Sequence, residues 1–195
     1  MARDPDFDLI KRCQSDDPDV FELAFDEIFS LYKDRVYNTA YRVVGNAEDA
    51  LDVSQEVFVT VFRKIHEFQF GSRFFTWLYR IVINLAIDHR RRLQIGPALF
   101  SQAPVEEAAE KEVADQGDAL NKWAEDDHLE RKVQLALGRL SPKLRAIVVL
   151  RYFQGLAYHE IAETLGCSLG TVKSRLNRAH LSLQEFLQPI QEPEV

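Results

Sequence analysis

Residues 158–178 read YHEIAETLGCSLGTVKSRLNR, and their spacing predicts two short helices around a tight turn. The apolar side of the first helix is formed by Ile161, Ala162 and Leu165. Gly166 suits the left-handed residue that ends such a helix, because glycine has no Cβ. Ser168 can cap the next helix, since its hydroxyl can accept from unpaired backbone N–H groups. The stretch therefore predicts a helix-turn-helix.

The second helix of this stretch has two different faces. Its apolar residues recur at helical spacing and predict a buried back, made of Val172, Leu176 and Ala179. Its basic and polar front consists of Lys173, Ser174, Asn177 and Arg178, with Arg175 at the edge. A front of this kind can reach base edges and phosphates in the major groove of duplex DNA. The alternative interpretation is a surface helix pair of an ordinary α-helical protein.

The net charge of −7 over 195 residues, taken as one value, argues against DNA binding. The charge is, however, distributed unevenly along the chain. Residues 1–100 carry a net charge of −3, residues 101–130 carry −8, and residues 131–195 carry +4. The local charge sets the field that a phosphate backbone meets. The segment with the helix-turn-helix is therefore compatible with DNA binding, and the acidity is concentrated in the middle of the chain.

Composition and spacing also restrict the fold and the location. The hydrophobic fraction of 46% is enough for packed cores, and the apolar spacing is helical almost throughout, so we expect an all-α fold of small domains. The chain has no apolar run long enough for a bilayer and begins with an acidic stretch, which predicts a cytoplasmic protein without membrane insertion. Cys13 and Cys167 form no CxxC motif, and we expect free thiols that are buried or idle.

An enzyme is the weakest alternative. The five histidines are dispersed, and His159-Glu160 lacks the second histidine of an HExxH zinc site. The sequence has no Walker A motif and no GxSxG motif. We therefore expect no catalytic residue, no metal site and no cofactor.

The N-terminal half predicts four helices. A short one contains Leu9-Ile10, the second runs from the turn at 15–18 to Gly45-Asn46, the third covers 47–68, and the fourth runs from Thr76 to about Arg92. The second helix carries an aromatic and apolar stripe that we interpret as core: Phe21, Phe25, Ile28, Phe29, Tyr32, Val36, Tyr37, Ala40 and Tyr41. The predicted buried side of the third consists of Val57, Val61, Ile65 and Phe68, with Phe58 and Phe62.

Two polar surfaces remain in this half. Asp52, Gln55 and Glu56 leave an acidic face on the third helix, which is either simply solvated or a protein-docking face. The loop 69–75 holds aromatics and an arginine. It precedes a polar stripe of Trp77, Arg80, Asn84, Asp88 and Arg91, and a basic cluster over 89–92. Cations are favourable at any helix C-terminus, but aromatics followed by cations also suit single-stranded DNA.

The second half follows an acidic segment with little apolar periodicity, which we interpret as a flexible linker over 96–128, helical at most in part. Leu129, Val133, Leu137 and Leu140 mark the first helix of the second domain. The start of the next helix is predicted by Ser141 as a cap and Pro142 at the first helical position, and that helix continues through Leu144, Ile147, Val148 and Tyr152. Gln154-Gly155 turns the chain into the helix-turn-helix.

Four motifs in this order resemble the extracytoplasmic-function (ECF) group of bacterial RNA polymerase sigma factors. The residues that carry the resemblance are 52–58, 75–81 with Asn84, 140–142 with Arg145, and 158–162 with 170–175. Each motif alone is weak, but the four in order around an acidic linker are highly specific. The resemblance implies two all-α domains, region 2 over 1–95 and region 4 over 129–188, joined by the linker and followed by a tail over 189–195.

The resemblance also implies a function. Such a protein binds core RNA polymerase through the β′ clamp helices and the β subunit, recognises the promoter −10 and −35 elements, and directs transcription initiation. An anti-sigma factor is the other partner that the family implies. The alternative is a helix-turn-helix transcription regulator that acts without forming a polymerase holoenzyme.

Residue roles follow from the matched motifs. The resemblance implies that polymerase is bound by Asp52, Gln55 and Glu56. The resemblance implies that the −10 element, including an extruded base, is bound by Phe70, Ser72, Arg80, Asn84, Arg90 and Arg91, with Arg92 in the same cluster. It implies that the −35 element is bound by Lys173, Ser174, Arg175, Asn177 and Arg178.

The chain departs from the family pattern at three places, one of which is the Asp16–Asp26 stretch, slightly longer than usual. Gln69-Phe70 stands where the family usually has Arg-Gly before the serine of the −10 loop, which puts the −10 base preference in doubt. Ala157 replaces the serine that normally caps the first helix of the helix-turn-helix. The lost cap should cost about 1 kcal/mol of helix stability without changing the function.

Overall fold

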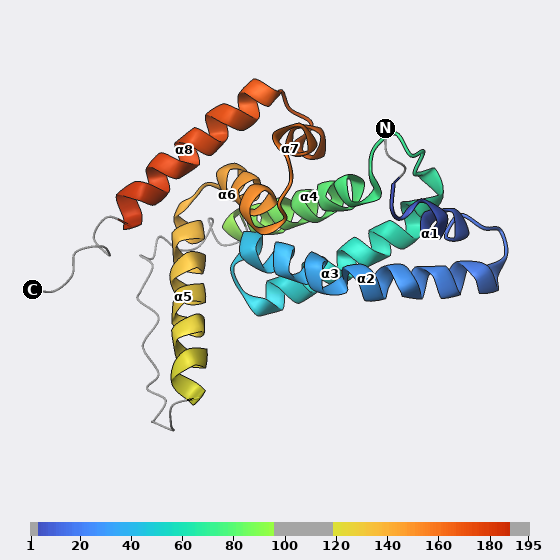
Figure 1. Ribbon diagram of the computed structural model, residues 1–195, viewed down its shortest axis with the longest axis horizontal. Helices are drawn as coiled ribbons and strands as arrows, with labels where there is room; N and C mark the ends of the chain where they lie inside the picture. The colour runs from blue at the N-terminus through green and yellow to red at the C-terminus, as the bar shows by residue number, and fades with distance from the viewer. Residues whose placement is uncertain (1–3, 96–118, 188–195) are drawn as a thin grey trace, which may run out of the picture.

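The computed structural model describes the backbone of residues 4–95 and 119–187 and the side chains of 4–92 and 129–186. Within these ranges every element is helical, which confirms the all-α prediction (Figure 1). The elements are α1 (Phe7–Arg12), α2 (Pro18–Val44), α3 (Ala47–Lys64), η1 (Ile65–Glu67), α4 (Phe74–Ile95), α5 (Ala119–Arg139), α6 (Pro142–Val148), η2 (Val149–Phe153), α7 (Tyr158–Leu165) and α8 (Leu169–Leu187). None of these described helices has the length and apolarity needed to cross a membrane. Most of the expected linker and the tail lie outside the described residues.

The N-terminal half is a bundle in which α2, α3 and α4 pack on one another and α1 packs on α2 (Figure 1). Local chemistry sets the helix ends. Asp17 caps α2 by accepting from the backbone N–H of Asp19 at 3.0 Å. Gly45 ends α2 at a φ of 106°, and Asn46 then caps α3 by accepting from the N–H of Asp49 at 2.8 Å. These boundaries agree with the sequence prediction.

The core of this bundle contains most of the apolar residues that the helical spacing selected. The prediction was wrong for two aromatics that it placed in the core, because Phe29 is 44% exposed and Phe62 is 51% exposed. Phe62 meets the rings of Phe21 and Phe25 edge-on, at centroid distances of 5.0 and 5.2 Å. The spacing placed both aromatics on an apolar side, but the part of the chain that the structure describes leaves both rings partly open to solvent.

The C-terminal half confirms the predicted helix-turn-helix in α7 and α8. Gly166 adopts a left-handed φ of 58°, and Ser168 Oγ accepts from the N–H of Thr171 at 3.1 Å. Ala157 makes no side-chain cap, but Glu160 Oε2 accepts from the N–H of Ala157 at 2.8 Å. One half of a capping box therefore remains at the start of α7.

Three features of the C-terminal half differ from the sequence prediction. Helix α5 begins at Ala119, ten residues before the expected domain start, and Leu129 on it is exposed. Among the described side chains of α5, the buried ones are Ala136 and Leu137, and Leu140 is buried just after the helix ends. Tyr152 lies in the π-helical turn η2 and is exposed, with its hydroxyl 2.6 Å from His180 Nε2. Ser141 precedes α6 but makes no side-chain cap hydrogen bond.

The two halves dock against each other at the C-terminal end of α2. Arg145 of α6 is only 1% exposed, and its Nη1 donates to the carbonyl of Val43 at 2.8 Å. Gln134 of α5 donates to the carbonyl of Tyr41 at 3.0 Å. The last carbonyls of a helix lack partners inside the helix and favour a cation. Side chains of the second half therefore complete the end of a helix in the first.

Both cysteines are free thiols, as predicted, with Cys13 buried and Cys167 partly exposed. Burial raises the pKa of the Cys13 thiol from 9.0 to about 11. Because the thiolate is the reactive form, we expect alkylation of Cys13 at pH 8 to be roughly a hundredfold slower in the folded than in the unfolded chain. Mass spectrometry after iodoacetamide treatment, with and without guanidinium, measures this. Equal rates in both conditions would contradict the buried position.

Candidate nucleic-acid and polymerase interfaces

The outward face of α3 carries the acidic and amide residues that the sequence singled out. Asp52, Gln55 and Glu56 are all exposed and are spaced so that they share one side of the helix. Val59 follows one turn later and is also exposed. An apolar residue beside carboxylates on an open helix face is compatible with a protein contact, because such a face gains burial and charge pairing together.

The front of α8 is exposed and basic. Lys173, Ser174, Asn177 and Arg178 are exposed, and Arg175 at the edge is partly buried. The opposite side of the helix is held in the core by Val172, Leu176 and Ala179. Among the described side chains, Lys173, Arg175 and Arg178 have no carboxylate partner within 4.0 Å. Their charges are therefore available to phosphates or base edges.

The loop between η1 and α4, which we call the −10 loop (residues 68–73), has an unusual backbone. Phe70 adopts a φ of 55°, which non-glycine residues rarely do. Its ring lies 4.6 Å from the ring of Phe7 and 5.0 Å from that of Phe68, measured between centroids. Ser72 is partly buried, and its hydroxyl donates to the carbonyl of Arg73 at 3.4 Å. The Phe70 ring therefore packs against two other rings of the N-terminal half and also lines a pocket.

The basic residues of α4 do not all face the same way. Arg80, Asn84 and Arg91 are exposed, with Arg91 3.2 Å from Asp88. Arg90 turns back, and its Nη1 donates to the carbonyl of Val43 at 3.3 Å. Burial lowers the pKa of this guanidinium below its ordinary value. A DNA contact by Arg90 would require the side chain to leave the end of α2.

Helix α7 covers part of the polar stripe of α4. Arg80 donates from Nη2 to the carbonyl of Glu163 at 2.6 Å and from Nε to that of Thr164 at 3.3 Å. The hydroxyl of Tyr79 donates to Gln154 Oε1 at 2.6 Å. The two Arg80 contacts could not be found in the sequence, because backbone carbonyls at the end of a helix carry no residue signal.

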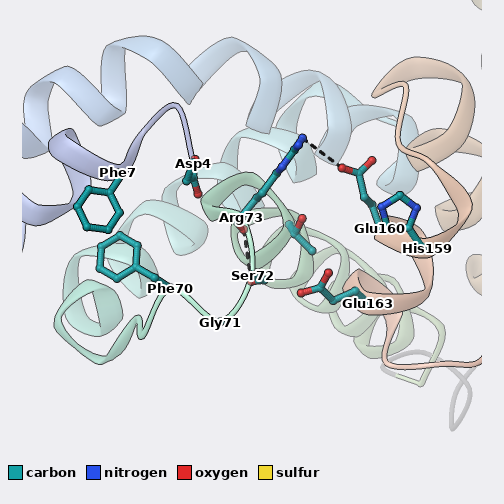
Figure 2. Close-up of a pocket in the computed structure, with 10 residues that line it drawn as sticks. Asp4, Phe7, Phe70, Gly71, Ser72, Arg73, His159, Glu160 and Glu163 are labelled. Atoms are coloured by element: carbon teal, nitrogen blue, oxygen red, sulfur yellow. Dashed lines mark hydrogen bonds and ion pairs between the residues drawn. The ribbon is translucent and has the colours of Figure 1, made fainter. Parts of the chain in front are cut away.

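A cavity of about 460 Å³ lies where the −10 loop meets α7 (Figure 2). Residues from both halves line it: Asp4, Phe7, Phe70, Gly71, Ser72, Arg73, Thr76, His159, Glu160 and Glu163. Figure 2 shows Arg73 reaching across to Glu160, with Nη1 3.4 Å from Oε1. Three carboxylates face this space, and like charges repel a phosphate backbone. The docked arrangement therefore leaves the fronts of α3 and α8 open but closes the −10 loop against α7.

Two family models match the two halves of the chain. The model for Sigma-70 region 2 matches residues 28–95, and the model for Sigma-70 region 4 matches residues 130–183. The order of the two regions agrees with the order of the motifs in the sequence.

Two solved structures have the same fold. The structure of CnrH in complex with the cytosolic domain of CnrY has a TM-score of 0.68 and 24% identity, over 94% of this chain and 97% of that chain. The sigma factor RpoE of Bartonella quintana, solved with the anti-sigma factor NepR, has a TM-score of 0.65 and 24% identity, over 84% of this chain and 96% of that chain. At this identity the likeness concerns the fold.

Relatives with higher identity define the family. The ECF RNA polymerase sigma factor SigW of Bacillus subtilis is 34% identical over 93% of this chain and 96% of its own length. The RNA polymerase sigma-H factor of Pseudomonas aeruginosa is 33% identical over 97% of both chains. SigE of Mycolicibacterium smegmatis is 38% identical over 84% of this chain, which spans only 62% of that protein. Together with both region matches, these relatives establish that the chain belongs to the ECF sigma factors of bacterial RNA polymerase.

Proposed function

We propose that the protein binds core RNA polymerase, recognises promoter −10 and −35 elements, and directs transcription initiation in the cytoplasm, as a transcription factor and not as an enzyme. The observation that carries this proposal is the presence of two open faces on one chain. The acidic face of α3 belongs to the half that matches region 2, and the basic front of α8 belongs to the half that matches region 4. A sigma factor needs one face for polymerase and another for duplex DNA.

In this proposal, residues 1–95 act as the polymerase- and −10-binding domain, and residues 129–188 as the −35-binding domain. The segment 96–128 connects them, and 189–195 form a tail. Asp52, Gln55 and Glu56 contact the clamp helices of the β′ subunit. The front of α8 enters the major groove of the −35 element, where arginine can read guanine and lysine can hold phosphate.

Opening of the −10 element requires a change in the docked arrangement. Arg80 can reach DNA only if its guanidinium leaves the carbonyls of Glu163 and Thr164. A base extruded toward the −10 loop would also meet the carboxylates of α7. We therefore expect α7 to move away from α4 when the promoter binds, which leaves Arg80 and Asn84 open to the separated strands.

An anti-sigma factor is the further partner that we propose. The B. quintana sigma factor of similar fold was solved with such a protein. Surfaces that bind polymerase and DNA must be masked when transcription of the target genes is not needed. A protein that covers the face of α3, the front of α8, or both would provide that control.

Runoff transcription tests the proposed function directly. Core polymerase from the source organism, a fragment library of its genome and the purified full-length chain should yield transcripts with defined starts. Core alone should yield none. If the chain binds a specific duplex without polymerase and never directs a transcript, the alternative of a regulator that forms no holoenzyme is correct.

A further inference from the structure

The first residues of the described chain contact the −10 loop through hydrogen bonds and through ring contacts. The region 2 family model starts only at residue 28, so this N-terminal segment (residues 4–14) lies outside it. It includes α1, which packs on α2, and it places three different groups against the loop. Figure 2 shows two of its residues, Asp4 and Phe7, beside the loop. These groups contact the beginning, the middle and the end of the loop.

Gln14 contacts the beginning of the loop. Its Nε2 donates to the carbonyl of Ile65 at 2.9 Å and to that of Phe68 at 2.8 Å. One amide nitrogen has two hydrogens, so both are used here. The two carbonyls lie at the first residue of η1 and at the residue that ends it. The side chain therefore fixes where the chain leaves η1 and enters the loop.

Asp4 contacts the end of the loop. Its Oδ2 accepts from the N–H of Phe74 at 2.6 Å, and its Oδ1 accepts from the N–H of Asp6 at 3.0 Å. Phe74 is the first residue of α4, where backbone N–H groups lack partners and a negative charge is favourable. The carboxylate therefore fixes the point at which the loop becomes a helix.

The middle of the loop is Phe70, the residue with positive φ. The ring of Phe7 lies against its ring, and the ammonium of Lys11 lies 5.0 Å from its centroid. A rare backbone conformation persists only when its surroundings hold it. Phe7 and Lys11 lie on α1, so the N-terminal segment holds this conformation from outside the loop.

We propose that the N-terminal segment is a positioning element for the −10 loop, and that Gln14 and Asp4 act through it on the choice of the extruded base. This inference rests on the proposed function, in which the loop captures that base. A base pocket discriminates only if its walls are fixed to a fraction of an ångström. Gln14 and Asp4 touch no DNA in this proposal, and they fix the two ends of the loop that does.

The test uses holoenzyme formed from core polymerase and the full-length chain. The probe is a library of single-stranded DNA oligonucleotides with the −10 element of the non-template strand randomised. Selection and sequencing give the preference for each base at each position. The variants are Gln14→Leu, which removes both hydrogen bonds at similar volume, and Asp4→Ala, with Asp4→Asn as the conservative change that keeps an acceptor.

We expect Gln14→Leu and Asp4→Ala to reduce the preference for the captured base by about tenfold, while core affinity changes by less than about twofold. Asp4→Asn should restore most of the preference. Gln184→Leu, which changes an exposed glutamine of α8, is the matched control and should retain the wild-type preference.

Two results would overturn the inference. Wild-type preference in both Gln14→Leu and Asp4→Ala would show that the loop needs no outside support. A parallel loss of core affinity and melting temperature would show that these residues only maintain the fold. A wild-type holoenzyme that selects no base at all would instead refute the −10 assignment in the proposed function.

Discussion

Replacing Arg175 by alanine is expected to weaken binding of the −35 duplex by about 5- to 150-fold, which corresponds to a lost base contact of about 1–3 kcal/mol. Arg175 is the partly buried member of the α8 front, so packing already restrains its side chain before DNA binds. A restrained guanidinium loses less side-chain entropy when it forms two parallel hydrogen bonds to a guanine. The loss should therefore depend on the sequence of the duplex.

Fluorescence anisotropy with the holoenzyme and a labelled −35 duplex measures this loss. Lys143→Ala is the matched control, because Lys143 is an exposed cation of the same half that lies on another helix, α6. Arg178→Ala should behave differently from both. Its loss of affinity should be nearly uniform across duplex sequences, and the slope of log binding constant against log salt concentration should fall by about one. If Arg175→Ala and Lys143→Ala weaken binding equally, the front of α8 supplies only net charge.

The double variant Asp52→Ala and Glu56→Ala is expected to weaken binding of core polymerase by roughly 30-fold or more, since breaking interfacial charge pairs costs about 2–5 kcal/mol. Both carboxylates stand on the open face of α3, next to the exposed side chain of Val59. Their partners on polymerase would be left buried without a counter-charge. Binding of the −35 duplex by the free chain should remain unchanged.

Competition with a labelled sigma factor for core polymerase measures this affinity. Asp26→Ala with Asp34→Ala removes the same charge from exposed positions on α2 and serves as the control. A fall in melting temperature with the Asp52 and Glu56 variant would mean that the bundle itself is damaged. An equal loss in both double variants would contradict a specific docking face on α3.

The sequence alone predicted those features whose causes lie within a few residues. Gly45 ends α2, Gly166 ends α7 and Ser168 caps α8, as expected. Each of these depends on the chemistry of one side chain next to its own backbone. The open front of α8 was predictable for a similar reason, because helical periodicity alone separates Lys173 and Arg178 from the buried Val172.

Burial at the edges of the helices was less predictable. Phe29, Phe62, Leu129 and Tyr152 have the spacing of core residues, but all four are substantially exposed. Periodicity identifies the apolar side of a helix but does not show whether another element covers that side. The start of α5 at Ala119 was missed because the acidic composition of this segment concealed a helix. Among the described side chains of α5, the buried ones are Ala136 and Leu137, near its end.

The family, the all-α fold and the two open faces were determined by the sequence, because side-chain type and helical period define them locally. The tertiary structure decided which polar side chains are already engaged. Arg80, Arg90 and Arg145 all donate to carbonyls at the ends of other helices, and Gln14 and Asp4 bind the backbone at the two ends of the −10 loop. Their partners are backbone groups, which every residue carries, so only the three-dimensional arrangement can select them.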